Sequence, residues 1–321
     1  MEMISSPSTN TSVEGGDAQA VVVESKKPMP DKVTIINLIT QCVTYLRRSE
    51  TILTHAQGAF AIMETMHPAD FIEFRDYLVP ASGFQSVAFR SMEQLLGVPY
   101  KTRALVNGMD VFSYLHLEEQ KQLADEGKLP SLHAVITRLL CRVKVPETFV
   151  QVYLDANRVV LEQQQYDIAR APRNDPKAKS LIENGVERMQ QMLSDPVPWS
   201  DGLVLESDDE AQEYKKAVLA ALFVISYRHE NIFAPLATLL DALIATEEGL
   251  LLWRGRHLHM AERMIGRRSG TGGTSSGVGY LDVTRRYRIF HALWLVRKLF
   301  IRASALPAMQ TYGIDEGHLF E

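Results

Sequence analysis

Apolar side chains recur at three- and four-residue spacing along most of the chain, which is the pattern of helices packed on one another. The first such run extends from Asp31 to about Met66 and ends before His67-Pro68, a pair that interrupts a helix. It predicts one long helix with Asp31 as its N-cap. The residues that carry the pattern are Val33, Ile35, Ile36, Leu38, Ile39, Cys42, Leu46, Leu53 and Phe60.

Further helices are predicted from the same spacing, and short helices and loops are expected over 98–130. A turn is indicated at 80–83, a helix stop at Gly97 and a break near Ala234-Pro235. No alternating strand pattern is longer than a few residues, so we expect an all-α protein, a single-domain antiparallel helical bundle. The predicted helices cover 69–78, 84–97, 131–143, 146–168, 178–193, 210–228, 231–264 and 283–301.

Residues 1–30 differ from the rest of the chain because polar and small residues dominate them. A run of serine, threonine, asparagine and proline over 5–12 is followed by Gly15-Gly16 and, later, by Lys26-Lys27 and two prolines. Such a stretch buries too little apolar surface to offset the entropy of ordering it. We therefore expect a disordered tail over 1–30 and one helical domain over 31–321.

Composition narrows the class of protein without identifying it. The chain has 321 residues, 46% of them hydrophobic, and a formal net charge of −5, which disfavours partners such as nucleic acid or an anionic membrane. Its longest apolar run, Ala217–Tyr227, is far shorter than the roughly 20 residues that span a bilayer, and no signal peptide is evident. Cys42 and Cys141 have no metal-binding spacing. We expect a reduced, soluble, cytoplasmic protein.

The segment Phe71–Leu78 is a first candidate for chemistry, because on a helix Phe71, Arg75 and Leu78 share one face. An arginine among aromatic and aliphatic side chains needs an anion, since an unpaired buried guanidinium is very costly. Two anions are possible. Spacing alone favours a carboxylate of the protein itself, and the alternative is a substrate carboxylate held by two parallel hydrogen bonds.

The segment Leu251–Gly266 contains two histidines that face different ways. His257 shares an apolar stripe with Trp253 and Met264, whereas His259 points about 160° away. Two histidines at this spacing cannot share a metal ion, which disfavours a zinc site. A single imidazole in an apolar wall suits axial ligation of a haem iron. A core histidine with a protein partner is the more frequent arrangement, and both interpretations stay open on the pattern alone.

The segment Gly270–Gly277 contains only glycine, serine and threonine, and it predicts an irregular loop. No Gly-Lys-Ser/Thr follows, Ser275 stands where a dinucleotide-binding loop has glycine, and a helix precedes the loop. A nucleotide site is therefore disfavoured. The loop is either a flexible linker or a place where backbone and small hydroxyls approach a ligand closely.

Together these segments resemble the tryptophan 2,3-dioxygenase family, over about residues 33–300 and weakly over 100–210. The matching segments are Phe74–Ser86 (F-R-x-x-L-x-P-x-S-G-F-Q-S) with Phe89, Arg90 and Glu93 after it, Trp253–His257 (W-R-x-R-H) with Arg263–Gly266 after it, and Gly270–Gly277 (G-T-G-G-S-S-G) with Tyr280-Leu281 after it. Motifs of this length in the same order and at the same separation make the resemblance specific.

The resemblance implies an all-α, haem-dependent enzyme of tryptophan catabolism, usually a homotetramer, that inserts O₂ across the indole C2–C3 bond of L-tryptophan to give N-formylkynurenine. By motif position, His257 resembles the axial ligand of the haem b iron and Arg75 the arginine that pairs with the substrate carboxylate. Thr271 resembles the threonine whose loop contacts the substrate ammonium and carboxylate. Phe71 stands where family members often have a tyrosine that assists this carboxylate.

One part of the family pattern is missing. The family carries a distal-side helix with H-Q-x-x-E-L-W, which by family spacing falls within roughly the first 30 residues. That stretch holds no histidine or tryptophan, and His55 does not replace the motif because it lies within the next helix. No catalytic distal histidine is therefore assigned. We expect an open distal side, rapid autoxidation and weak dioxygenase activity, changed little by deletion of residues 1–30.

Three functions stay open at this point: a tryptophan dioxygenase, a related haem enzyme for another aromatic amino acid, and a non-catalytic relative that binds haem or an amino acid. An incomplete gene model, a re-formed distal side and a degenerate protein that keeps the fold would each account for the missing helix.

Overall fold

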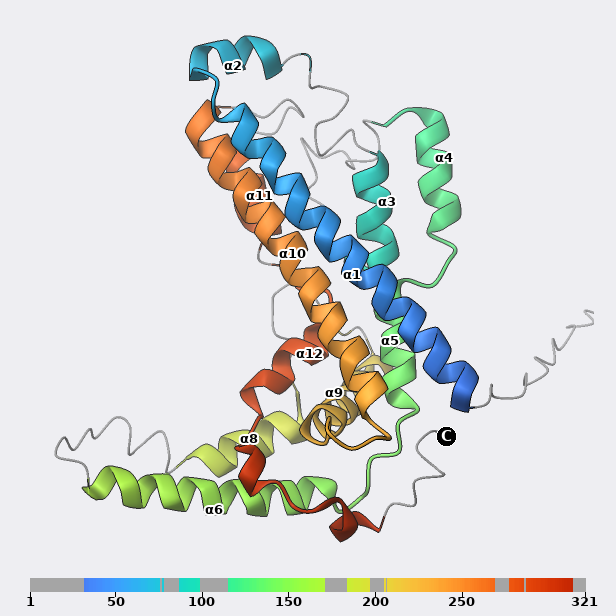
Figure 1. Ribbon diagram of the computed structural model, residues 1–321, viewed down its shortest axis with the longest axis vertical. Helices are drawn as coiled ribbons and strands as arrows, with labels where there is room; N and C mark the ends of the chain where they lie inside the picture. The colour runs from blue at the N-terminus through green and yellow to red at the C-terminus, as the bar shows by residue number, and fades with distance from the viewer. Residues whose placement is uncertain are drawn as a thin grey trace, which may run out of the picture.

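The computed structural model describes residues 32–75, 77, 87–98, 115–170, 184–196, 205, 207–268, 277–285 and 287–313. This part of the chain is helical and contains no strand, which confirms the all-α prediction. The helices are α1 (Lys32–Met63), α2 (Pro68–Phe74), α3 (Val87–Leu96), α4 (Leu117–Glu126), α5 (Leu132–Cys141), α6 (Phe149–Arg170), α8 (Gly185–Ser194), α9 (Asp208–Ser226), α10 (Ala234–Ile265), α11 (Gly277–Thr284), α12 (His291–Leu295) and three short 3-10 helices, η4 (Val296–Lys298), η5 (Ala303–Ala305) and η6 (Met309–Tyr312) (Figure 1).

Several sequence predictions fall outside these residues. Among them are the predicted tail over 1–30, the predicted N-cap at Asp31 and the predicted turn at 80–83. Among the described residues, no helix is long and apolar enough to cross a membrane.

The two longest helices, α1 and α10, lie side by side along most of their length and run parallel (Figure 1). The inner stripe of α1, which consists of Ile39, Leu46, Leu53 and Phe60 at seven-residue spacing, is buried against α10. Thr246 donates a hydrogen bond to the Leu46 carbonyl at 3.2 Å, and Phe60 stacks on His257 further along the same pair. A seven-residue apolar repeat is what keeps two helices in continuous contact.

The prediction of an antiparallel bundle is wrong for this pair. Short loops make neighbouring helices antiparallel, but α1 and α10 are far apart in sequence and no short loop dictates their direction. The intervening helices return the chain to the end of the molecule from which α1 started (Figure 1).

The main core surrounds α9, which contacts α5, α8, α10 and α12. Its largest side chains are fully buried aromatic rings, including Phe149, Tyr153, Phe223 and Phe233, and several of these rings contact one another edge to face. The N-terminal half of α10 is part of this core, whereas its C-terminal half extends away from it and meets α1, α2 and α11 (Figure 1).

Helix boundaries follow the predicted signals closely. The His67 side chain accepts a hydrogen bond from the Ala69 N–H and begins α2, and Ser131 caps α5 by accepting from the Ala134 N–H. Gly97 ends α3 with φ of +94°, and a Cβ there would lie 2.7 Å from the Ser131 hydroxyl. Pro235 stands in the first turn of α10, so the break expected near it coincides with the start of the helix.

The single helix predicted over 283–301 is wrong. The segment is divided into the end of α11, a non-helical stretch over 287–290, α12 and η4. Ile289 and Phe290 donate their backbone N–H groups to the Glu247 carboxylate of α10 at 2.6 and 3.2 Å. This tertiary acceptor replaces the carbonyls that a continuous helix would have supplied, and local spacing does not reveal it.

Candidate functional site

His257 lies in the C-terminal half of α10, inside an aromatic wall formed by Phe60, Phe89 and Trp253. Its ring stacks on Phe60 with centroids 5.0 Å apart and planes 6° apart. Trp253, one turn earlier on α10, lies 5.5 Å from the imidazole and 5.0 Å from Phe89 of α3. Three helices therefore position this histidine, and the predicted apolar stripe on α10 is confirmed.

The two nitrogens of His257 are in different environments. Nδ1 is buried and has no hydrogen-bond partner, whereas Nε2 is not among the buried unpaired atoms. Burial lowers the pKa of His257 from its ordinary 6.5 to about 4, because the charged imidazolium loses its hydration. The ring is therefore neutral at pH 7 and has a lone pair to offer.

Other histidines contrast with His257. The His259 side chain is 72% exposed and lies 3.7 Å from the Glu262 carboxylate, so the predicted difference between the two neighbours is confirmed. His55 is exposed on α1, with its Nδ1 2.8 Å from the Thr51 carbonyl of the same helix. His291 has both nitrogens buried and unpaired. His257 differs from His291 in having only one nitrogen that is both buried and unpaired, and in its place beside the rings of Phe60 and Trp253.

A buried ion-pair network fixes α10 at this point. Arg254 is 3% exposed and donates to the Glu93 carboxylate of α3 at 2.6 Å and to the Thr284 carbonyl of α11 at 3.1 Å. Arg90 donates to the other oxygen of Glu93 at 2.7 Å. Two guanidinium groups therefore share one carboxylate, and each oxygen of Glu93 accepts from one of them.

The second arginine of the same motif, Arg256, pairs with Glu64 just beyond the end of α1. Arg254 and Arg256 thus have a structural role that spacing alone did not reveal, because their partners are remote in sequence. The sequence feature that could have indicated these ion pairs is the family resemblance, because its matching segments include Arg90, Glu93 and both arginines of α10. These charges orient the helix that carries His257.

Phe71 and Arg75 lie one turn apart at the end of α2, which packs against α10. Phe71 is 5% exposed and belongs to a small apolar cluster with Phe60, Met260 and Met264. It is therefore a packing residue that attaches α2 to the helix of His257. Arg75 caps α2, with its backbone N–H bonded to the Phe71 carbonyl, and its side chain is half-buried.

Thr271 and its loop lie outside the described residues, as do most positions of Phe74–Ser86. The structure therefore brings both His257 and Phe71 close to Phe60, and it places Arg75 at the C-terminal end of the helix that carries Phe71. In the described part of the chain, no three or more histidine, cysteine or acidic side chains gather as a metal site. A haem needs only one protein ligand, and a neutral imidazole in an aromatic wall fits that requirement.

The chain matches a family model and several known proteins. A family model described as tryptophan 2,3-dioxygenase matches residues 28–300. A tryptophan 2,3-dioxygenase of Sorangium cellulosum is 33% identical, with 92% of this chain and 74% of that protein covered. Tryptophan 2,3-dioxygenase 2 of Ralstonia nicotianae is 36% identical, with 84% and 76% covered. A tryptophan 2,3-dioxygenase-like protein of Xanthomonas campestris is 35% identical, with 77% and 96% covered.

Proposed function

The chain belongs to the tryptophan 2,3-dioxygenase family, and on this premise we propose that it is a haem-dependent dioxygenase that adds both atoms of O₂ across the indole C2–C3 bond of L-tryptophan to give N-formylkynurenine. The observation that carries the proposal is the neutral His257 imidazole in its aromatic wall, on the helix of the most specific motif.

His257 is the proposed axial ligand of haem b. Bound haem supplies the activation of O₂ that the side chains cannot perform. The protein keeps the imidazole neutral by burial, fixes its ring plane by stacking on Phe60 and holds α10 through the Arg254–Glu93 pair. A ligand held in this way needs little reorganisation when haem binds.

The substrate is proposed to be held through its charged groups and its ring separately. Arg75 pairs with the carboxylate, and the loop of Thr271 contacts the ammonium and the carboxylate. Phe71 cannot donate a hydrogen bond, so at this position the carboxylate lacks one family contact and depends more on Arg75. Because Phe71 packs on Met260 and Met264, its contribution is to fix the helix that ends at Arg75.

The distal side of the haem stays a prediction, since residues 1–30 lie outside the described residues. His55 has no part in it, because its ring is exposed and bonded to its own helix. A homotetramer in the cytoplasm, as is usual for the family, completes the proposal.

The deciding experiment is to purify the full chain with haem supplied during expression, record the Soret spectrum, and follow N-formylkynurenine after L-tryptophan is added to the ferrous protein in air. We expect a histidine-ligated haem spectrum and product from L-tryptophan but not from L-tyrosine or L-phenylalanine. Product from another aromatic amino acid alone would favour the related enzyme. Haem binding without any product would favour a non-catalytic relative.

A further inference from the structure

A second apolar stripe follows α1 one residue before the inner stripe. Leu38, Tyr45 and Ile52 are 51%, 64% and 68% exposed, although all three are large hydrophobic side chains. Ile35, Cys42 and Ser49 alternate with them along the helix, at the three- and four-residue spacing of a coiled-coil seam. We call these six residues the outer stripe. The inner stripe already pairs with α10, so the outer stripe is available to another helix.

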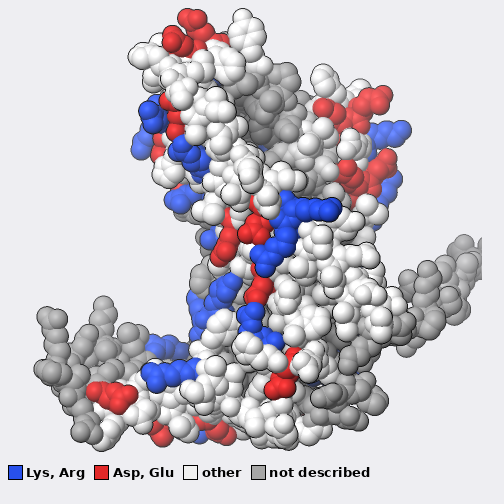
Figure 2. All heavy atoms as spheres, in the orientation of Figure 1, with Lys and Arg blue, Asp and Glu red and all other residues white. Residues whose placement is uncertain are grey.

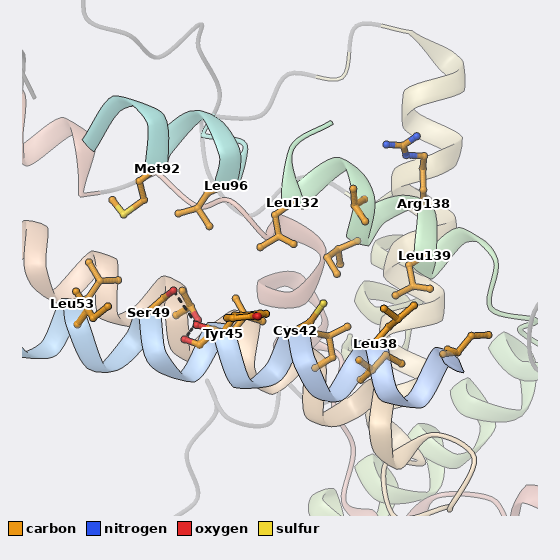
Figure 3. A pocket seen from close by; sticks show the side chains of 18 of the residues that line it. Leu38, Cys42, Tyr45, Ser49, Leu53, Met92, Leu96, Leu132, Arg138 and Leu139 are labelled. Carbon is orange, nitrogen blue, oxygen red and sulfur yellow. Dashed lines mark hydrogen bonds between the residues drawn. The ribbon is translucent and has the colours of Figure 1, made fainter. Parts of the chain in front are cut away.

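The outer stripe forms one wall of an open groove of about 950 Å³. Figure 3 shows the opposite wall, where Met92 and Leu96 of α3 and Leu132 and Leu139 of α5 extend toward α1. The groove has no acidic residue in its lining. Arg138, at its edge, points away from α1 in Figure 3 and donates to the Ala134 carbonyl of its own helix. Arg142 lines the groove as well. Apart from these two arginines, Tyr45, Ser49 and Thr246, the lining is apolar.

The surface around this groove is low in charge. Figure 2 shows a broad area without charged side chains beside the N-terminal half of α1, whereas lysine, arginine, aspartate and glutamate gather in a band next to it. The groove is lined by 19 residues. A standard protein interface uses roughly 20–30 residues on each side. A monomer that exposed this much contiguous apolar surface would be prone to aggregation.

The order of side chains along the outer stripe identifies the occupant. The positions of the outer stripe are symmetric about the point midway between Val43 and Thr44. Each large residue of the stripe has a residue of smaller or equal size at the same distance on the other side of this point. Tyr45 corresponds in this way to Cys42, Leu38 to Ser49 and Ile52 to Ile35. Two antiparallel copies of α1 that cross at this point would place each large side chain opposite its smaller counterpart, which is how facing layers interdigitate.

We propose that the groove is the seat of α1 from a second copy of this chain, paired antiparallel about a two-fold axis near Val43 and Thr44. In a two-fold interface the same surface of each copy must supply both the protruding side chains and the recess that receives them. The outer stripe and the groove beside it meet this requirement. The inference specifies an interface within the assembly named in the proposed function, but it does not depend on haem or on the reaction.

Disulfide trapping tests the direction and register of the pair. The variant Leu38→Cys/Ser49→Cys, made in a Cys42→Ser background of the full chain, should form a covalent dimer on mild oxidation. Within one helix these positions are about 16 Å apart along the axis, too far for an intrachain disulfide. Across the proposed axis they face each other. We expect most of the protein to run as a dimer on non-reducing gels.

Two controls make the result specific. Leu38→Cys alone should give little dimer, because residue 38 faces residue 49 of the second copy and lies about 16 Å from its own counterpart. Thr40→Cys/Arg47→Cys has the same symmetry about the axis, but both positions are exposed on another face of α1 and should not cross-link. Dimer from Leu38→Cys alone would indicate parallel pairing and overturn the proposal, as would absence of dimer from the double variant.

A second measurement needs no cysteine. Tyr45→Glu places two like charges near the axis, which costs affinity, and the molar mass by light scattering should fall to half or less of that of the unmodified chain. Thr40→Glu should leave the mass unchanged. A Tyr45→Glu protein of unchanged mass would overturn the proposal. Loss of tryptophan turnover with cross-linking intact would contradict only the proposed function.

Discussion

Glu247 and His257 are both enclosed side chains of α10, ten residues apart, but their hydrogen bonding is opposite. The Glu247 carboxylate accepts from the N–H groups of Ile289 and Phe290 and from the Trp294 indole N–H at 2.6, 3.2 and 2.9 Å. The His257 Nδ1 has no partner at all. The N-terminal half of α10 therefore has a buried polar group that accepts three hydrogen bonds, and the C-terminal half has one with a buried, unpaired nitrogen.

The contrast is between a polar group that the fold itself pairs and one that we propose binds a ligand. Burial raises the pKa of Glu247 even against its three donors, and it lowers the pKa of His257 with nothing opposing it. In both cases the cost of burial falls on the charged form. Only for Glu247 do other parts of the protein compensate, and this difference predicts that the two side chains respond differently to replacement.

The largest effect on stability is expected from Glu247→Ala. It leaves three buried donors unpaired, and removing one side of such a network costs about 3–5 kcal/mol. The free energy of unfolding, measured in urea on the apo-protein, should fall by this amount. His257→Ala is the matched variant and should cost clearly less, because no partner of the imidazole is lost. Equal losses in the two variants would remove the distinction drawn between them.

Arg75→Ala should have the next largest effect, on catalysis. A charge-assisted pair in a dry site is worth on the order of 2–4 kcal/mol, so kcat/KM for L-tryptophan should fall about 100-fold or more. Arg75→Lys should recover only part of this loss, because an ammonium cannot form two parallel hydrogen bonds. Unchanged kinetics in Arg75→Ala would return the residue to a purely structural ion pair. Circular dichroism of the variant guards against misfolding as the cause.

His257→Ala is expected to lose most of its bound haem, about a tenfold or greater weakening of binding, consistent with removal of an axial ligand. The haem-to-protein ratio and the Soret spectrum after purification measure it. His259→Ala changes an exposed histidine two residues away on the same helix and should retain haem fully. A normal spectrum in His257→Ala would end the assignment.

The smallest effect concerns pH. The folded pKa of His257, about 4, lies below its ordinary 6.5, so between these values the unfolded chain holds a proton that the folded chain does not. Its contribution to stability is complete above pH 6.5 and is lost as pH falls to 4. Allowing for partial exposure, this is about 1–2 kcal/mol. Urea unfolding of the apo-protein should therefore show a shallower fall for His257→Phe than for the unmodified chain, and identical slopes would contradict the assignment.

Much of the fold was accessible to sequence reasoning where the signal is local. The break at His67, the start of a helix at 131 and the stop at Gly97 depend on neighbouring residues only, and all three are present in the structure, where Ser131 is the N-cap of α5. The direction of α1 relative to α10 and the division of 283–301 depend on contacts made across the whole chain. For the latter, the carboxylate of Glu247 competes with the helix for two N–H groups, which no spacing within 283–301 indicates.

The candidate site divides in the same way. The face of His257 follows from helical spacing on α10, and the structure confirms its apolar surroundings. The partner of Arg254 does not follow from spacing, because Glu93 is 161 residues away in the chain. The roles of Arg75, Phe71 and Thr271 rest on family resemblance, and Thr271 lies outside the described residues.

The pairing of α1 with α10 has a consequence for synthesis of the protein. The Thr246–Leu46 hydrogen bond joins residues 200 apart, and at about 5–20 residues per second α10 leaves the ribosome roughly 10–40 s after α1. During this time the inner stripe of α1 has no partner and is exposed to other chains. Contacts of such long range also slow folding. We therefore expect the yield of active protein to depend on translation speed and on chaperones that protect α1, and not only on the stability of the finished helix pair.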